Sequence, residues 1–352
     1  MLGFRLYFLA LIAPLVYFTF KFVFPDTFST TITTLQGILK PSNIAATEIT
    51  VAATTTATTM STDATTTAAT PDTIVSGKKM PVLFLSHGGP NLLSDDEYPL
   101  DEGIGKELQR IGKHITEEIK PKMVLVISAH WQAEPNAVHI NQQQFTPLIY
   151  DFYGFPAKYY SATFEHIGSP ELAHNVVNLL QSQKINAKTV NRGMDHGVWV
   201  ALKKAGLEKA KFPIVEMSLY NNESMEKHIE LGKALAPLRE QGVLIIGSGM
   251  AVHNLRDLWN ARDSVPDYVP KFDKQLDDIV LKSRAAENES IADVRARGAT
   301  ELAKSPYLRR AHPALEHLLP FHVVIGAAED SKARKLAKLF ELSLSWSCYM
   351  LD

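Results

Sequence analysis

Three short apolar runs decide the fold: PVLFLSHGG at residues 81–89, MVLVISAHW at 123–131 and GVLIIGSG at 242–249. Each run is rich in Val, Ile and Leu and has Gly, Ser or His near its end, which is typical of a strand buried on both faces. PIVEMSL at 213–219 has the same character. The four runs therefore predict a mixed or mostly parallel central sheet that is covered on both sides.

Longer amphipathic stretches alternate with these strands, and we predict them as helices at 102–119, 169–183 and 225–241. Ser169 is suited to cap the second helix with Pro170 at its first position, and Gly242 is suited to close the third. A further apolar run, FHVVIGAA at 321–328, is predicted as the last strand. This alternation predicts an α/β fold: one domain with helices on both faces of the sheet.

That single domain is expected to span residues 79–352, because the first 78 residues have another character. LYFLALIAPLVYFTFKFVF at 6–24 is almost wholly apolar, and at about 1.5 Å per residue a helix of this length just crosses a bilayer core of about 30 Å. We therefore predict a hydrophobic helix and single-pass membrane anchor at residues 1–25. A cleaved signal segment is the alternative, which would make the protein secreted or organellar. Residues 26–78, with runs such as TTTATTMSTDATTTAAT, are predicted to be a Thr-rich disordered linker.

Composition excludes several classes of function. The formal net charge is −2, so no basic field is available to attract nucleic acid phosphates, and no nucleic-acid partner is expected. Cys348 is the single cysteine, so neither an intrachain disulfide nor a cysteine-based metal cluster is available. A metal site in this chain must be built from His, Asp and Glu.

Histidines stand at the ends of three apolar runs: His87 in LFLSHGGP, His130 in LVISAHW and His253 in IIGSGMAVHNL. One histidine in such a position is more often structural than a ligand. Three in the same position favour a metal site, because side chains that leave the carboxyl ends of strands converge at one edge of an α/β sheet. His312, His317 and His322 crowd the segment before the last apolar run, and at most two of them are expected to face that site.

His196 lies in RGMDHGVWVAL, which we interpret as a loop. Asp195 beside it is expected to raise its pKa, and Gly197 allows a substrate to approach the backbone. His196 is therefore a candidate acid/base group, and an ordinary turn histidine is the alternative.

Six segments carry a resemblance to a known family: SHGGP, SAHW, YDFYGFP, DHGVW, SGMAVHNL and HPALEHLLPFHVVIGAA. In this order they resemble the class III extradiol ring-cleavage dioxygenases related to the bacterial and plant DOPA dioxygenases, over about residues 80–350. The resemblance implies a metal bound by His87, His130 and His253 with His317 beside it. It also implies that His196 is the catalytic acid/base.

The implied activity is the opening of a DOPA-like catechol ring with O₂ by a metal-dependent oxidoreductase. Fe(II) is the expected cofactor, and Zn(II) also suits an all-histidine site. Tyr150, Phe152 and Tyr153 are predicted to bind the aromatic substrate, with packing beneath a turn as the alternative. A zinc-dependent hydrolase and a non-catalytic, membrane-tethered binding domain are the competing functions. The sequence favours no particular oligomeric state.

Overall fold

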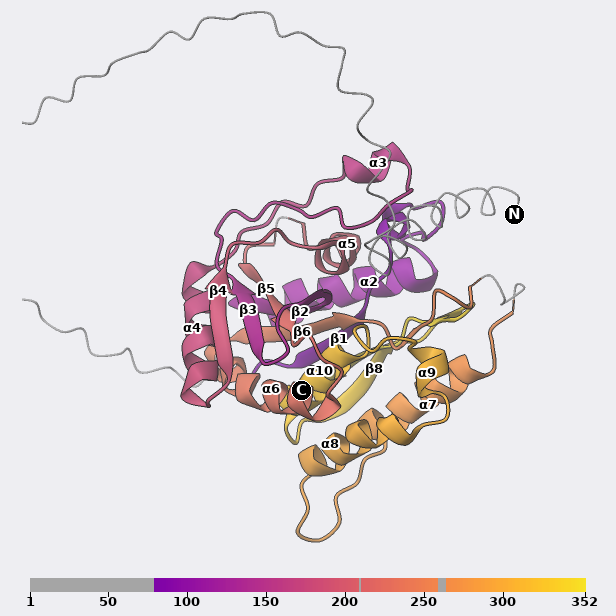
Figure 1. The fold of residues 1–352 in the computed structure, drawn as a ribbon. Coiled ribbons are helices and arrows are strands. Elements are labelled where there is room, and N and C mark those ends of the chain that lie inside the picture. The colour runs from indigo at the N-terminus through magenta and orange to yellow at the C-terminus, as the bar shows by residue number, and fades with distance from the viewer. Residues whose placement is uncertain (1–78, 209, 259–263) are drawn as a thin grey trace, which may run out of the picture. The chain divides into compact units, whose positions relative to one another are not determined.

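A central sheet of eight strands organises the computed structural model, in the order β4-β3-β5-β2-β6-β1-β11-β8 (Figure 1). The structure describes residues 79–208, 210–258 and 264–352, all of which belong to one compact unit, Ile74–Asp352. The strands of this sheet are β1 (Val82–Ser86), β2 (Met123–Gln132), β3 (Ala137–Asn141), β4 (Asn186–Val190), β5 (Ile214–Leu219), β6 (Val243–Gly249), β8 (Ala333–Ala337) and β11 (Cys348–Leu351).

The sheet is mixed, as predicted. Strands β1, β6, β2 and β5 run parallel, and β3 is parallel to β4. Antiparallel pairing joins β3 to β5, β1 to β11 and β11 to β8. A second, small sheet has the order β7-β10-β9 and consists of β7 (Val252–His253), β10 (Leu344–Ser345) and β9 (Phe340–Glu341).

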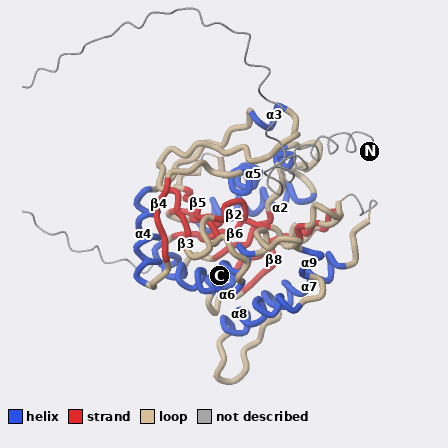
Figure 2. The backbone as a smooth tube through the Cα atoms, in the orientation of Figure 1, coloured by secondary structure: helices blue, strands red, loops and turns tan. Residues whose placement is uncertain are grey.

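Helices cover both faces of the large sheet (Figure 2). The α-helices are α2 (Gly103–His114), α3 (Ala157–Tyr160), α4 (Pro170–Ser182), α5 (His196–Lys204), α6 (Met225–Leu235), α7 (Tyr268–Leu281), α8 (Ile291–Glu301), α9 (Leu308–Ala311) and α10 (Leu319–Ala328). Shorter elements are the 3₁₀ turns η1 (Pro90–Leu93), η3 (Ala236–Gln241) and η4 (Leu302–Lys304) and the π-helical turn η2 (Ile115–Ile119).

Alternate residues of each central strand enter two separate cores. In β1, Leu83 and Leu85 pack with α2 and α5 on one face, whereas Val82 and Phe84 pack with α4, α6 and α10 on the other. Every residue of β1 is buried. Because β1 is buried on both faces, its sequence is a continuous apolar run rather than an alternation of apolar and polar residues.

The predicted helix ends are confirmed. The Ser169 hydroxyl accepts a hydrogen bond from the backbone N–H of Leu172 at 3.0 Å, with Pro170 at the first helical position. Gly242 has a φ of +86°, the left-handed conformation that ends a helix and that glycine adopts without strain.

The prediction of a strand at 321–328 was wrong, because these residues form helix α10. All ten residues of α10 are buried between the large sheet and the helices α6 and α8, so the segment has no polar face. An apolar run of this length has no period that separates a buried strand from a buried helix. The Pro at position 320, in the first turn, was the available helix signal.

No helix among the described residues is both long and apolar enough to cross a membrane. The predicted anchor at 1–25 and linker at 26–78 lie outside the described residues.

Helices α6 and α10 pack against each other through two glycines. A Cβ atom added at Gly232 would lie 2.0 Å from the Val323 carbonyl oxygen, and one added at Gly326 would lie 2.0 Å from the Ile229 carbonyl oxygen. Each helix therefore touches the backbone of the other, and neither can accept a side chain there without moving.

We predict that Gly232→Ala lowers the free energy of unfolding by about 2–3 kcal/mol, because the methyl group overlaps backbone atoms of α10. Gly298→Ala on α8 is the matched control. Its Cβ would meet only the side chain of Ile279, at 3.2 Å, so the change should stay within about 1 kcal/mol. Urea unfolding of both variants measures the difference. Equal free energies of unfolding in the two variants would contradict the close backbone contact between α6 and α10.

Candidate metal centre

The parallel strands β1, β6 and β2 place two histidines at one edge of the large sheet. Ser86 of β1 pairs with Gly249 of β6, and Ser128 of β2 pairs with Ser248. His87 follows the first pair by one residue and His130 follows the second by two. The edge is the carboxyl end of the parallel strands, where ligands bind in open α/β sheets.

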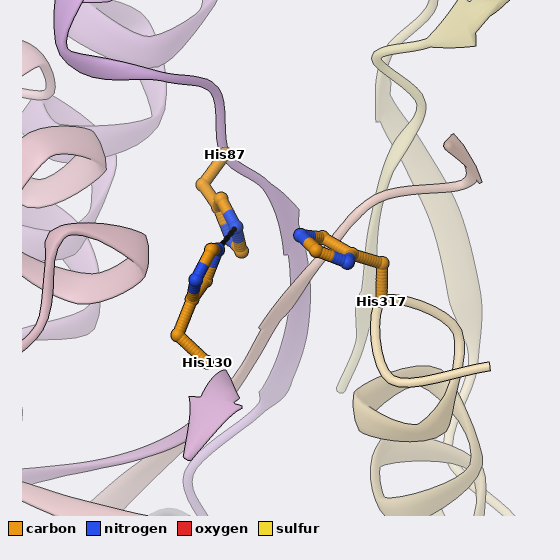
Figure 3. A group of neighbouring side chains, drawn as sticks. All are labelled: His87, His130 and His317. Atoms are coloured by element: carbon orange, nitrogen blue, oxygen red, sulfur yellow. Dashed lines mark hydrogen bonds between the residues drawn. The ribbon is translucent and has the colours of Figure 1, made fainter. Parts of the chain in front are cut away.

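The imidazole rings of His87, His130 and His317 point toward one another (Figure 3). The Nε2 atoms of His87 and His130 are 3.0 Å apart. One nitrogen from each of the three rings lies within 4.8 Å of the others, a spacing at which all three reach a single ion.

Hydrogen bonds set the tautomer of His87. The Ser248 hydroxyl donates to the carbonyl of Gly197 at 2.5 Å, so its oxygen is left to accept from His87 Nδ1 at 2.9 Å. His87 therefore carries its proton on Nδ1 and presents the lone pair of Nε2 to the other histidines. An outer group that fixes the ring and its tautomer in this way is usual around metal-binding histidines.

Asp151 lies on the other side of His130. Its Oδ2 atom is 3.5 Å from His130 Nδ1, and His130 Nε2 lies 3.0 Å from His87 Nε2 (Figure 3). With the His130 proton on Nδ1, beside this carboxylate, the Nε2 lone pairs of both rings would be available to one cation, so the donor arrangement fits a bound metal ion.

His253 enters this group through His317. It belongs to β7, and its ring stacks on that of His317 with centroids 3.6 Å apart and planes at 15°. Of the four expected ligands, His317 makes the close approach to His87 and His130, and His253 lies against the face of the His317 ring. His253, Glu316 and His317 form a second group with ligand atoms within 4.8 Å.

His196 lies at the first position of α5, whereas the sequence suggested a loop. Its ring centroid is 4.2 Å from that of His130. Gly197 makes the approach feasible, since a Cβ there would lie 2.6 Å from His130 Cδ2. A glycine directly after His196 therefore lets α5 begin against the histidine cluster.

The carboxylate that contacts His196 is Asp151, not the neighbouring Asp195. Asp151 Oδ1 accepts hydrogen bonds from His196 Nδ1 at 2.9 Å and from the His196 backbone N–H at 3.0 Å. Asp195 instead accepts from Ser128 at 2.7 Å and from Arg192 at 3.1 Å, on the buried side of the sheet edge. The carboxylate partner of His196 is thus Asp151, where the sequence suggested Asp195.

Burial and mutual repulsion keep the cluster neutral. Burial, with a smaller contribution from His196, lowers the pKa of His130 to about 4, and burial with the charge of His130 lowers the pKa of His87 well below its usual value. The pKa values of His253 and His317 are lowered in the same way. Burial alone would raise the pKa of Asp151, but its hydrogen bond and charge interaction with His196 bring it down to about 2. Neutral imidazoles beside an ionised carboxylate are the protonation states that a metal ion requires.

The three predicted aromatic residues differ in position. The Phe152 ring stands edge-on to His196, with centroids 5.6 Å apart, and is 5% exposed. Tyr150 packs against Phe152 and Trp199 and donates its hydroxyl hydrogen to Ala162 O at 2.8 Å. Tyr153 is 71% exposed. Phe152 is thus the member of the predicted set that lies beside the histidine cluster.

Of the three histidines around the last apolar run, only His317 joins the cluster, within the expected limit of two. His312 is hydrogen-bonded to Ala251 O at 3.0 Å and His322 lies 3.2 Å from Leu318 O and Ala299 O, all in the core. Sequence reasoning missed Asp151 and Ser248. The signal for Asp151 was an acidic residue between two aromatic ones in YDFYGFP. The signal for Ser248 was a serine near the end of a predicted buried strand, where histidines end two other predicted strands.

Comparison with known proteins decides the family. Residues 81–348 match the family described as the catalytic LigB subunit of aromatic ring-opening dioxygenase. The chain belongs to this family.

Individual proteins similar to this chain agree with the family match. A Beta vulgaris protein named 4,5-DOPA dioxygenase extradiol is 38% identical over 255 residues, which cover 71% of this chain and 88% of the relative. A 4,5-DOPA dioxygenase extradiol-like protein of Schizosaccharomyces pombe is 33% identical over 74% of this chain and 89% of its own length. A crystal structure of an uncharacterised Escherichia coli K12 protein aligns with a TM-score of 0.61 and 26% identity, over 78% of this chain and 100% of that one. Dioxygenases of this family depend on a metal, and the histidine cluster gives this chain a place to hold one.

We predict that Ser248→Ala weakens metal binding about tenfold to a hundredfold, because the His87 ring loses the acceptor that fixes its tautomer. Ser86→Ala is the control, since the Ser86 hydroxyl bonds to Ser347 O at 2.9 Å and not to the cluster. Competition with a chromophoric chelator measures both affinities. Unchanged affinity in Ser248→Ala would mean that the orientation of His87 does not depend on Ser248.

Proposed function

We propose that this protein is an extradiol dioxygenase that opens the ring of a DOPA-like catechol with O₂, with His196 as its acid/base. The family match supports ring-opening dioxygenase activity, and the relatives reported above carry the extradiol name. The observation that carries the proposal is the close approach of the Nε2 atoms of His87 and His130, 3.0 Å apart, with the His196 ring next to that of His130. Neither a hydrolase nor a binding domain is favoured by these relatives.

His87 and His130 would hold the ion, with the third ligand drawn from the stacked pair His253 and His317. Fe(II) is the proposed ion, because it binds both a catechol and O₂ and passes electrons between them; Zn(II) fits the same ligands without that redox chemistry. All four imidazoles are neutral, so the ion would keep its full positive charge and favour the ionised catechol.

His196 is proposed to move the protons. Its Nδ1–H donates to Asp151, which leaves Nε2 with a free lone pair that accepts a proton from a catechol hydroxyl. The resulting imidazolium is stabilised by the Asp151 carboxylate and returns a proton as the ring opens. Both oxygen atoms of O₂ then reside in the product, an open-chain semialdehyde acid, and no further reductant is needed. Phe152 is proposed to form an apolar wall for the aromatic ring.

The membrane tether remains a prediction of the sequence. We propose that residues 1–25 anchor this domain to a membrane through the linker at 26–78, on the basis of their composition alone.

The reaction class is tested by loading the metal-free chain with Fe(II) or with Zn(II) under argon and then adding a catechol and O₂. We predict O₂ uptake and yellow semialdehyde product from 4-substituted catechols with Fe(II), and neither with Zn(II). Catechol-independent ester or amide hydrolysis in the Zn(II) form would instead favour a hydrolase.

We predict that His196→Ala retains metal affinity within about threefold but lowers the rate of ring cleavage by at least about a hundredfold, since it removes the proton acceptor and no ligand. His174→Ala on the exposed side of α4 is the control and should cleave catechols at the parent rate. Chelator competition and single-turnover absorbance give the two readouts. Full turnover in His196→Ala would rule out its role as the acid/base.

A further inference from the structure

The small sheet carries a carboxylate on the same face as His253. His253 of β7 pairs directly with Leu344 of β10, and Leu344 pairs directly with Glu341 of β9. Directly opposed residues of antiparallel strands project from one face, so the three side chains form a row. With about 4.8 Å between neighbouring strands, the Cα atoms of Glu341 and His253 lie about 10 Å apart.

The cores on either side of the small sheet agree with this assignment. Val252 and Phe340, the neighbours of His253 and Glu341 in their strands, pack into the core formed with α6 and α10. Leu344 packs instead against the core formed with α2 and α5. The row of Glu341, Leu344 and His253 therefore faces away from the first core and lies on the face of the small sheet that carries the His253 side chain.

A second path through the structure also connects Glu341 to the cluster. The Trp346 indole lies against Gly88, the residue after His87, because a Cβ at Gly88 would be 2.3 Å from Trp346 Cη2. At its other end, the same indole donates from Nε1 to Glu341 Oε2 at 2.9 Å. Glu341 is thus separated from the backbone beside His87 by the length of one indole ring.

Glu341 is held in place and keeps acceptor capacity. Besides Trp346, the hydroxyl of Tyr98 donates to its two oxygens at 3.0 and 3.2 Å. A carboxylate offers about four lone-pair positions, and these two donors do not fill them. Within the described part of the chain no lysine or arginine forms an ion pair with Glu341, so its negative charge has no cationic partner there.

Two carboxylates contact the histidines directly. Asp151 accepts a hydrogen bond from His196, and Glu316 lies 3.2 Å from His317 Nδ1, whereas the charge of Asp195 is offset by its ion pair with Arg192. A negatively charged substrate tail beside Asp151 and Glu316 would be repelled, whereas a cationic tail would be attracted.

We propose that Glu341 binds the ammonium group of the substrate and so selects catechols that carry an alkylammonium side chain. The distance from a catechol bound at the histidines to an ammonium two carbons off the ring is comparable with the separation of His253 and Glu341. This inference rests on the proposed ring-cleaving function and names its substrate class. Glu341 is a specificity residue: it contacts the far end of the substrate and takes no part in proton transfer.

The test uses the Fe(II)-loaded full chain and three catechols of nearly equal size: 4-(2-aminoethyl)catechol, 4-propylcatechol and 3-(3,4-dihydroxyphenyl)propanoate. We expect kcat/KM to be highest for the amine and lowest for the carboxylate. Glu341→Gln keeps the shape and the hydrogen bonds from Tyr98 and Trp346 but removes the charge. It should lower kcat/KM for the amine about tenfold and leave that for 4-propylcatechol within about twofold.

Anaerobic calorimetry supplies a readout that does not depend on turnover. The dissociation constant of the amine should rise about tenfold in Glu341→Gln, and that of 4-propylcatechol should not change. Glu301→Gln, an exposed glutamate on α8, is the control and should reproduce the parent values for all three catechols.

Different outcomes separate this inference from the proposed function. Cleavage of 4-propylcatechol without any preference for the amine would overturn the role of Glu341 and leave the dioxygenase function standing. An equal loss for all three catechols in Glu341→Gln would show a structural role and would also overturn it. Failure of the parent protein to cleave any of the three would overturn the proposed function, and this inference with it.

Discussion

The centre depends on the parallel pairing of β1, β6 and β2. This pairing places Ser86 beside Gly249 and Ser128 beside Ser248, so His87 and His130 leave the sheet at the same height from strands that are distant in sequence. The middle strand, β6, contributes through a residue without a side chain at its end, Gly249. A Cβ at Gly249 would lie 2.2 Å from the carbonyl oxygen of His317, so only glycine lets the segment before α10 cross the end of β6 and deliver that imidazole. A shift of one residue in the pairing of β1 or β2 with β6 would turn the histidine that follows that strand away from the site.

Much of the architecture was predictable because local and global signals agree. The buried strands, the Ser169 cap and the Gly242 terminus all follow from rules that act over a few residues. Helix α10 was not predictable in this way, since an environment that is apolar on every side removes the periodicity on which the distinction depends. Strands β8 and β11 add antiparallel pairing at one side of the sheet. Both are short, and three of the five residues of β8 are not buried, so these segments carry little hydrophobic pattern.

The site was predictable in its ligand type but not in its internal connections. Histidines at strand ends could be read from sequence, because the fold determines where strand ends meet. That Asp151 rather than Asp195 bonds to His196 depends on the direction in which each side chain leaves its backbone, and Asp195 is drawn away by Ser128 and Arg192. The stacking of His253 on His317 likewise joins β7 to the turn before α10, and no spacing along the chain encodes it.

The position of β1 between β6 and β11 has a consequence for biosynthesis. β1 is the first strand of the described chain, yet both of its neighbours are made much later, β6 at 243–249 and β11 at 348–351. During translation its apolar side chains and its backbone N–H and C=O groups therefore stay without strand partners until most of the domain has left the ribosome. Exposed segments of this kind favour association between nascent chains, so the protein is expected to rely on chaperones while it is synthesised.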